Sequence, residues 1–482
     1  MSTSKRLKAT GLAAVLATAL AVGAPQAQAA ATIIINNLNA AGVGFNDTTA
    51  AAPVGGNNGV TLGEQRLIAF TYAANLWGAT LTSNQPIIIN AQFSALTCTA
   101  ASAVLGSAGA TSIFANFANA PKANTWYSYA LANKISGIYQ GTANAAQINA
   151  NFNVNLGQPG CLTGTFFYLG LDGNHGTNTD FVAVLLHEMG HGVGFQTFTN
   201  GSTGAFNGGF PSIWDHYLFG VDAGKLWKDM TAAERVASAI SLDKLVWTGP
   251  LVTAAIPSVL RFGIATATFS GPAAGAATGV VRVGEAGFGA PIGSPALFGE
   301  LMPVADQTAG AGNGCEPFNT NNARAVNGRV ALIGRGTCGF VVKAKNAQNA
   351  GAIGVLIADN AAETAVQPTG LGGSDPTITI PTVRIFLADG NKLRESLKSR
   401  SRSGSGVFVS LGLTIAQYAG TDALGRAQMF APNPFQSGSS VSHFDTTMFR
   451  NQLMEPSING DLTQSVIPPQ DLTFRLLQDI GW

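Results

Sequence analysis

The feature that most constrains this chain is the short run from Phe181 to His191, which has the sequence FVAVLLHEMGH. Its apolar first half predicts a buried helix. Residues four apart lie on one face of a helix, so His187 and His191 can reach the same ion. Neutral imidazole nitrogen is a common zinc ligand, and Glu188 can reach a zinc-bound water without binding the metal. The run therefore predicts a catalytic zinc centre in preference to two histidines held by core hydrogen bonds.

A catalytic zinc ion needs a third protein ligand. The residues after His191 begin like the metzincin motif HExxHxxGxxH, but Thr197 stands where that motif has its third histidine. The third ligand must therefore come from elsewhere, and the candidates are His175, Asp215 with its neighbour His216, and His443. Asp215 is the rival to His443, because some peptidases with this motif use a downstream carboxylate. Its alternative role is a helix cap or a core hydrogen bond.

Three separated segments together resemble the leishmanolysin-type metzincins: HEMGHGVGF, then SHFDTTMFRNQLMEP, and finally LTFRLLQDIGW. In that family the third histidine follows a long insertion, and a methionine lies on a tight turn beneath the metal. The resemblance covers the helix motif and about 40 C-terminal residues. It implies that the zinc ligands are His187, His191 and His443, with Glu188 as the base and Met454 in the Met-turn.

The residues between these segments differ in composition. A stretch rich in glycine, alanine and proline is followed there by a βαβ pattern. The sequence NGRVALIGRGTCGFVVKAKNAQNAGAIGVLIADN, followed by IPTVRIFLADGNKLRESL, resembles the protease-associated domain. That module is found inserted in many secreted peptidases. The resemblance implies substrate handling or control of access, and the alternative is a structural spacer.

These features predict an α+β fold. We expect a metzincin-like zinc peptidase domain in two segments, residues 30–262 and 415–482, interrupted by an α/β protease-associated domain at 263–414. Residues 1–29 have the basic start, apolar run and Ala27-Gln28-Ala29 site of a signal peptide. The mature protein is then secreted or periplasmic. No later stretch is long and apolar enough to cross a bilayer, so we expect no membrane anchor.

Four cysteines in an exported chain indicate disulfides. Three pairings are possible, and proximity in sequence favours Cys98 with Cys161 and Cys315 with Cys338. The net charge of +1 gives no reason to expect binding to nucleic acid or to an anionic membrane.

A calcium site is a weaker possibility in the loop DGNHGTNTD, which precedes the histidine helix. Oxygen-bearing residues alternate there, at Asp172, Asn174, Gly176, Asn178 and Asp180. The loop departs from an EF-hand, with Thr177 in place of glycine and Ala183 in place of the closing glutamate. A polar turn that caps the helix is the favoured interpretation.

The function expected from these residues is hydrolysis of proteins or peptides by a secreted zinc metalloendopeptidase. Two other classes remain open. One is a non-catalytic protein that binds a partner through the protease-associated domain. The other is a zinc hydrolase that acts on a non-peptide bond.

Overall fold

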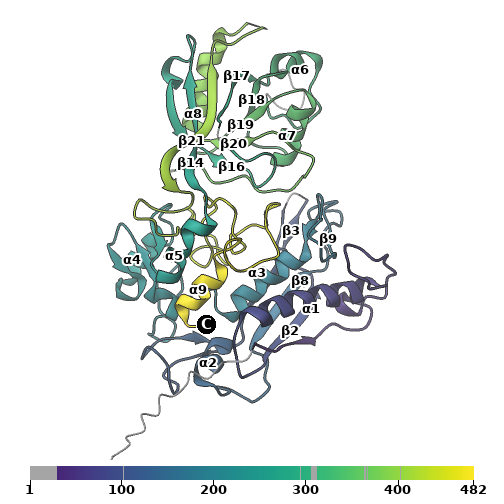
Figure 1. Ribbon diagram of the computed structural model, residues 1–482, viewed down its shortest axis with the longest axis vertical. Helices are drawn as coiled ribbons and strands as arrows, with labels where there is room; N and C mark the ends of the chain where they lie inside the picture. The colour runs from purple at the N-terminus through teal and green to yellow at the C-terminus, as the bar shows by residue number, and fades with distance from the viewer. Residues whose placement is uncertain are drawn as a thin grey trace, which may run out of the picture.

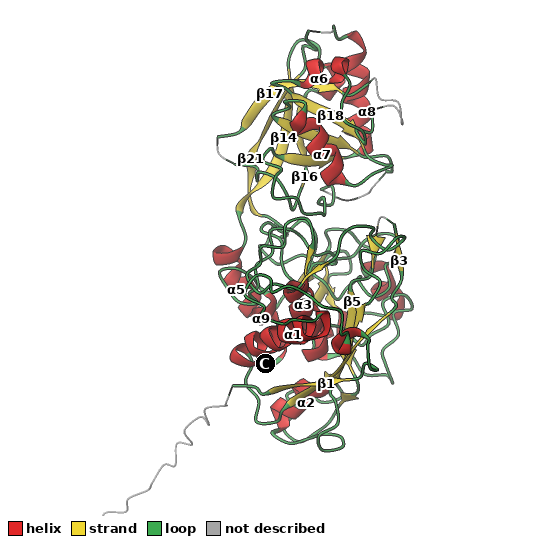
Figure 2. Ribbon diagram, turned by 90° about the vertical axis from the view of Figure 1, so that its right-hand side faces the viewer, coloured by secondary structure: helices red, strands yellow, loops and turns green. Residues whose placement is uncertain are grey.

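The computed structural model describes residues 30–100, 102–293, 295–305, 312–362, 365, 367–401 and 403–482. Figures 1 and 2 show two units stacked along the long axis of the molecule. The lower unit in Figure 1 contains the first half of the chain and the C-terminus, and the upper unit contains the middle of the chain. The expected signal peptide, residues 1–29, lies outside the described residues.

A four-stranded sheet forms one layer of the lower unit, in the order β1-β2-β8-β5. Its strands are β1 (Ile33–Asn37), β2 (Ile87–Ser94), β8 (Ile148–Asn153) and β5 (Gly106–Ala110). The first three run parallel, whereas β5 is antiparallel to β8 and forms an edge of the sheet. Side chains alternate along β2 between the core and the outer face, as the pleat of a strand requires.

Two helices form the centre of the lower unit: α1 (Leu62–Thr80) and α3 (Phe181–Val193). A capping box between Thr61 and Glu64 begins α1, and both hydrogen bonds of that box are present. The indole nitrogen of Trp77 donates to the carbonyl oxygen of Leu186 at 3.1 Å. Because Trp77 is fully buried, this bond fixes α1 against α3 within the core.

Every residue of α3 is buried, which confirms the core helix that its apolar sequence predicts. Asp180 begins the helix, because one carboxylate oxygen accepts from the amides of Val182 at 2.9 Å and Ala183 at 3.4 Å. Gly194 ends it with a φ of +131°, a conformation that glycine adopts easily.

The remaining elements of the lower unit are short. The helices are α2 (Tyr129–Ser136), α4 (Ala232–Ser238), α5 (Pro250–Val259) and α9 (Thr473–Ile480), with 3₁₀ turns at Gly44–Asn46, Ile213–His216 and Trp227–Asp229. The strands are β3 (Cys98–Thr99), β4 (Ser102–Ala103), β6 (Ile113–Phe114), β7 (Tyr127–Ser128), β9 (Phe167–Tyr168), β10 (Thr179–Asp180), β11 (Leu218–Gly220), β12 (Lys225–Leu226) and β13 (Leu245–Trp247).

The sequence predicts helices over 126–138 and 231–245, and both ranges are longer than the helices that form. The pattern over 126–138 gives only α2, because its first residues pair as β7 and Gly137 ends the helix in the left-handed region. The pattern over 231–245 gives only α4. Asp243 has a φ of +61°, and Leu245 already belongs to β13, which pairs with β11. Pairing between strands overrides the local helical preference in both places.

The upper unit is built on an eight-stranded mixed sheet, in the order β15-β14-β21-β17-β18-β19-β20-β16. The strands are β14 (Phe262–Ser270), β15 (Gly279–Arg282), β16 (Gly284–Glu285), β17 (Leu297–Pro303), β18 (Val330–Gly334), β19 (Gly354–Ala358), β20 (Thr382–Ile385) and β21 (Phe408–Tyr418). The helices are α6 (Thr320–Val326), α7 (Phe340–Asn349) and α8 (Leu387–Ser396). Short 3₁₀ turns lie at Gly275–Ala277 and Leu397–Ser399.

The predicted βαβ pattern is present in this sheet as β18, α7 and β19. The two strands are parallel neighbours, with Val330 opposite Gly354. One buried cluster joins α6 and α7 to one face of these strands, and a second cluster joins α8 to the other face. Helices therefore cover both faces of the parallel part of the sheet, as is usual for such sheets.

The chain enters and leaves the upper unit at one place. Strands β14 and β21 are antiparallel neighbours, and Phe262 at the start of one pairs with Tyr418 at the end of the other. Arg261, at the junction, forms a bidentate ion pair with Glu285 of the upper unit. Its guanidinium also lies 4.2 Å from the ring centre of Phe449, a residue of the returning segment. The junction is thus a pair of adjacent strands fastened by one arginine.

After β21 the chain returns to the lower unit and runs mostly as loops until α9. These loops are well buried, because Phe444, Leu453 and Met454 belong to the same core as α1 and α3. Helix α9 packs against the lower core, and Asp479 near its end accepts from the amides of Leu251 and Val252 at the start of α5. The returning segment therefore completes the fold of the lower unit.

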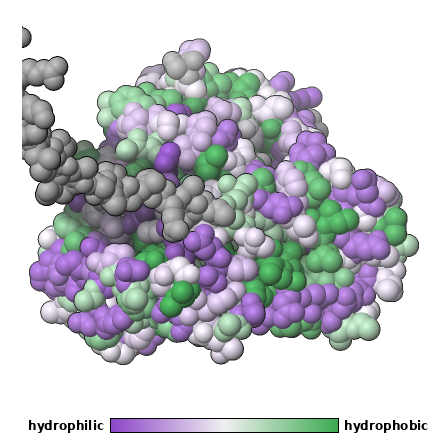
Figure 3. Space-filling view, turned by 60° about the horizontal axis from the view of Figure 1, so that its bottom comes forward, coloured by the Kyte–Doolittle hydropathy of each residue, from purple (hydrophilic) through white to green (hydrophobic). Residues whose placement is uncertain are grey.

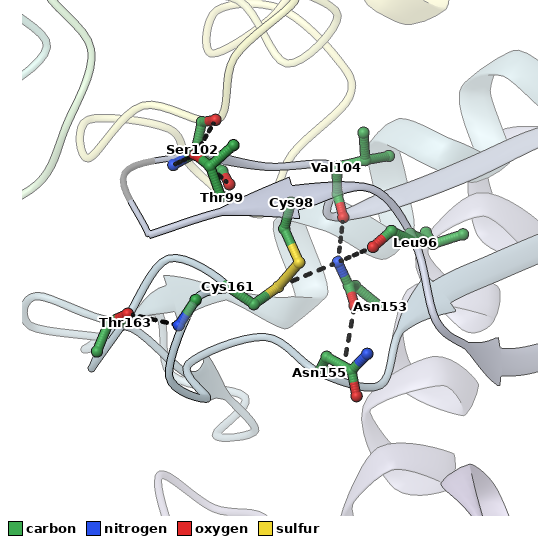
Figure 4. Close-up of a disulfide and its surroundings, with 10 residues drawn as sticks. Leu96, Cys98, Thr99, Ser102, Val104, Asn153, Asn155, Cys161 and Thr163 are labelled. Atoms are coloured by element: carbon green, nitrogen blue, oxygen red, sulfur yellow. Dashed lines mark hydrogen bonds between the residues drawn. A yellow bond between two sulfur atoms is a disulfide. The ribbon is translucent and has the colours of Figure 1, made fainter.

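The structure contains both disulfides that proximity in sequence favours. Cys98 is bonded to Cys161, and Cys315 is bonded to Cys338. Figure 4 shows the first of them beside Asn153 of β8, whose side-chain amide donates to the carbonyl oxygen of Val104 at 2.9 Å. This disulfide joins the segment that follows β2 to the loop that follows β8.

No helix in the part of the chain that the structure describes is long and apolar enough to cross a membrane. Figure 3 shows hydrophilic and hydrophobic residues interspersed over the face of the molecule that is turned toward the viewer.

The cap of α3 leads to a prediction about stability. Asp180→Ala leaves two amides at the start of a buried helix without their acceptor. We expect the free energy of unfolding to fall by about 1–2 kcal/mol. Urea titration of the metal-free protein, followed by circular dichroism, measures this. Asp180→Asn keeps a side-chain acceptor and should lose less; equal losses in the two variants would contradict the capping role.

Candidate metal centre

Three imidazoles from two distant parts of the chain converge in the lower unit. The Nε2 atom of His191 lies 3.2 Å from that of His187 and 3.1 Å from that of His443. The Nε2 atoms of His187 and His443 are 3.3 Å apart. All three rings are buried, and they form the one group of three or more potential metal ligands among the described residues.

The other nitrogen of each ring is held by a backbone carbonyl. Nδ1 of His187 lies 2.7 Å from the carbonyl oxygen of Leu453, Nδ1 of His191 lies 2.8 Å from that of Phe195, and Nδ1 of His443 lies 2.7 Å from that of Ser439. A carbonyl oxygen only accepts, so each Nδ1 carries the proton and donates it. Each Nε2 therefore has a free lone pair, and the three lone pairs point toward one place.

Burial keeps these rings neutral. Desolvation lowers the pKa of His187 to about 4 and that of His191 to about 3. It also lowers the pKa of His443 well below its ordinary value, and the two neighbouring imidazoles add to that effect. Neutral imidazole is the form that binds a metal ion, so the group is prepared for one at neutral pH.

The spacing of the three nitrogens fits zinc. With a zinc–nitrogen distance of about 2.0–2.1 Å, nitrogens 3.1–3.3 Å apart subtend roughly 100° at the ion, close to a tetrahedral angle. Three histidine ligands with one open position form a known type of catalytic zinc site. The donor set and its geometry therefore both suit this metal.

Glu188 lies next to the first histidine but faces the edge strand β5. Its carboxylate accepts a hydrogen bond from the backbone amide of Ala108, and burial raises its pKa to about 8. The space it occupies exists because residue 106 is glycine. A Cβ atom at Gly106 would lie 2.9 Å from Oε1 of Glu188 and 3.0 Å from its Cγ. The edge strand thus determines where this carboxylate sits.

Met454 lies against the histidine helix on the returning segment. Its sulfur is 2.8 Å from the position that a Cβ atom at residue 190 would take, so a larger residue there would have to displace the methionine side chain. The backbone amide of Phe444 donates to the carbonyl oxygen of Met454 at 2.8 Å. This bond connects the residue after His443 directly to the methionine turn.

Asp215, the alternative ligand, does not reach this centre. One carboxylate oxygen accepts from the hydroxyl of Thr197 at 2.7 Å, and the other accepts from the hydroxyl of Thr199 and from the amide of Ser212 at 2.8 Å. These bonds fix a buried carboxylate within its own loop. Asp215 therefore has the core hydrogen-bonding role that was its alternative. One of its donors is Thr197, which stands where the metzincin motif has its third histidine.

The two remaining histidines also lie outside the centre. His216 is hydrogen-bonded to the hydroxyl of Thr125 at 3.1 Å, and Nδ1 of His175 contacts the carbonyl oxygen of Asn178 at 2.8 Å. In the suggested calcium loop, Asp172 accepts from the hydroxyl of Tyr168. Asp180 caps α3, and no cluster of three ligands forms there among the described residues.

Several residues that shape the centre have no signal in the sequence. The carbonyls of Leu453, Phe195 and Ser439 act through the backbone, so their side chains do not reveal them. The contacts of Gly106 and Ala108 with Glu188 also depend on how the edge strand passes the helix. Only the three-dimensional fold makes these contacts evident.

Comparison with known proteins identifies the inserted unit. A family model described as "PA domain" matches residues 297–393, which confirms the predicted protease-associated domain. The chain therefore carries a PA domain between the histidine helix and the third histidine. The matched residues cover a minor part of the chain, so they define the inserted module and not the family of the whole protein.

Curated proteins with similar sequences match only in part. ER degradation-enhancing alpha-mannosidase-like protein 3 of Xenopus laevis is 35% identical over 117 residues, which are 22% of this chain and 13% of that protein. The minor extracellular protease Vpr of Bacillus subtilis is 29% identical over 144 residues, 30% of this chain and 15% of that protein. Vacuolar-sorting receptor 5 of Arabidopsis thaliana is 36% identical over 90 residues, 18% and 15% of the two chains.

Similar solved structures also match in part. The zinc aminopeptidase BSAP of Bacillus subtilis has a TM-score of 0.23 and 22% identity, over 34% of this chain and 36% of that one. The aminopeptidase of Aneurinibacillus sp. strain AM-1 has a TM-score of 0.22 and 20% identity, over 36% and 39% of the two chains. These scores describe a local likeness, and the activity of the chain has to be argued from its metal centre.

The position of Glu188 leads to a second prediction. Gly106→Ala places a methyl group against the Glu188 carboxylate and should displace it. On the sequence-based hypothesis that Glu188 is the general base of a zinc peptidase, hydrolysis of an unfolded protein substrate should fall about 100-fold, the lower range for loss of such a base, while zinc content stays unchanged.

Gly109→Ala is the matched control, because it lies on the same strand and the nearest atom to its new Cβ would be Oε1 of Gln196 at 3.8 Å. It should keep near-normal hydrolysis. Equal activity of the two variants would mean that the edge strand does not position Glu188.

Proposed function

We propose that this chain is a secreted zinc-dependent metalloendopeptidase of the leishmanolysin-like metzincin type. The observation that carries the proposal is the convergence of three neutral imidazoles on one point, beside a carboxylate that does not belong to the ligand set. His187, His191 and His443 would hold the ion. The late third histidine and Met454 behind the helix are the features that favour this branch of the metzincins.

In the proposed reaction the metal ion and the protein side chains have different roles. A bound zinc ion would lower the pKa of a water molecule and polarise the carbonyl of the substrate. Glu188 would take a proton from the attacking water on its carboxylate as the water oxygen bonds to the carbonyl carbon, and would give that proton to the amine nitrogen as the carbon–nitrogen bond breaks. Burial favours the protonated form of Glu188, and a dication held by the neighbouring imidazoles favours the ionised form that a base needs.

The edge of the lower sheet supports a peptide as the substrate. Among the described residues β5 pairs with β8 alone, and the carbonyl of Leu105, just before β5, continues this pairing by accepting from the amide of Asn153. The backbone groups of Gly106 and Ala110 therefore face outward, and between them the amide of Ala108 donates to Glu188 on the same side. An extended peptide can add to such an edge with backbone hydrogen bonds. A substrate held in this way extends past the centre at both ends, which favours cleavage within a chain.

Export from the cell fits the remaining features. The first 29 residues have the sequence of a signal peptide. The two disulfides are of the kind that persist in oxidising surroundings. We propose a location outside the cytoplasm on these grounds.

The role of Glu188 gives the third prediction. Glu188→Gln should bind zinc as the unaltered protein does, because this residue is not a ligand, and should lose hydrolysis by a factor of about 100 or more. Metal analysis and a casein assay with and without a chelator measure both properties. Retention of most activity would rule out the proposed mechanism. A wild-type protein that binds no zinc would favour a non-catalytic binding role, and one that binds zinc but cleaves only non-peptide substrates would favour another hydrolase.

The ligand set gives the fourth prediction. His443→Ala leaves two ligands on one helix and should lose zinc and hydrolysis together. Asp215→Asn is the comparison variant, because Asp215 was the rival ligand and its hydrogen bonds lie in a separate loop. It should retain both properties. Loss of zinc from Asp215→Asn with retention in His443→Ala would reverse the assignment.

A further inference from the structure

The three carbonyls that orient the imidazoles differ in how far along the chain they lie from the histidine that each one holds. Phe195 lies four residues after His191, and Ser439 lies four residues before His443, so each of these contacts is local. The carbonyl that holds His187 belongs to Leu453, 266 residues away. The orientation of His187 therefore depends on how firmly the turn around Leu453 is held in place.

A buried carboxylate holds that turn. The backbone amide of Leu453 donates to Oδ2 of Asp471 at 2.6 Å, and Asp471 is 2% exposed. The side-chain oxygen of Gln452 accepts from the amide of Leu472 at 2.8 Å, which makes a second bond between the same two segments. A hydrogen bond to a carboxylate is roughly twice as strong as one between neutral groups, so the bond from Leu453 is the stronger of the two.

We propose that Asp471 is a positioning residue of the metal centre, which holds the Leu453 backbone so that its carbonyl directs Nε2 of His187 toward the ion. The inference rests on the proposed function only in taking the three histidines as a zinc site. Asp471 touches neither the ion nor a substrate and acts through Leu453. Met454 follows Leu453 directly, so the same carboxylate also holds the methionine against the histidine helix.

The structure also indicates why this residue is an aspartate. Oδ1 of Asp471 accepts from the amide of Thr473 at 2.7 Å, while Oδ2 accepts from Leu453. Each oxygen thus serves a separate backbone amide. An asparagine has a single side-chain acceptor, and its NH₂ group would face one of these amides as a second donor. In Asp471→Asn the amide of Leu453 therefore faces either the NH₂ group or a neutral amide oxygen, and both hold it more weakly than the carboxylate does, with almost no change of shape.

Asp479 provides a matched control. It is buried, it lies in the same C-terminal segment, and it accepts from the indole of Trp247 and from the amides of Leu251 and Val252. Its bonds lead to the start of α5 and not to a residue that holds an imidazole. Asp479→Asn should destabilise the fold by the same kind of loss without altering His187.

The test is the zinc affinity of the full-length protein, measured by competition with a chromogenic chelator. We expect Asp471→Asn to weaken zinc binding about 10- to 100-fold, the usual effect of losing a residue that supports a ligand. Asp479→Asn should stay within about threefold of the unaltered protein. Unchanged affinity in Asp471→Asn, or equal weakening in both variants, would overturn the inference.

Two further measurements keep the test decisive. Gln452→Leu removes the weaker bond between the same two segments and should also weaken zinc binding. This variant tests the inference even if Asp471→Asn folds poorly. Unchanged zinc affinity in a folded Gln452→Leu protein would count against the inference. Cobalt(II) in place of zinc should show a changed visible spectrum in Asp471→Asn and an unchanged one in Asp479→Asn. An unaltered protein that binds zinc but cleaves no peptide would refute the proposed function and leave this inference standing.

Discussion

The centre of this protein depends on three hydrogen bonds from imidazole Nδ1 atoms to backbone carbonyls. They fix one tautomer at each ring, and burial keeps each ring neutral, so three lone pairs face a single point without any positive charge. Much of the lower unit serves this arrangement. Three contacts hold different elements around the imidazoles: the cap at Asp180, the bond from Trp77 to Leu186, and the turn at Leu453.

The inserted domain fits into this arrangement because it begins and ends at one place. Phe262 and Tyr418 are paired neighbours on β14 and β21, so the chain enters and leaves the added module at one place. Closing a long insertion costs little when its ends are already adjacent. Arg261 joins Glu285 of the upper unit to Phe449 of the returning segment, so the two units are fastened and not merely linked.

The sequence predicts the chemistry of the site better than its geometry. His187, Glu188 and His191 follow from helical spacing, whereas His443 required a resemblance, because nothing in local spacing connects residues 252 apart. The PA domain was recognisable because a strand, a Gly-rich loop, a helix and a second strand follow one another within a short stretch of sequence. The short strands of the lower unit were not, since pairing partners and not local preference decide them. Backbone contacts such as those of Leu453 and Ala108 leave no trace in side-chain identity.

The order of the ligands along the chain has a consequence for when the centre can exist. A ribosome makes residues 187 and 191 early, then the entire upper unit, and only then His443, 252 residues beyond His191. Until that point the growing polypeptide has two of the three imidazoles and lacks the turn that orients the first. Convergence of the three imidazoles is thereby tied to synthesis of the upper unit, because the last of them follows it along the chain.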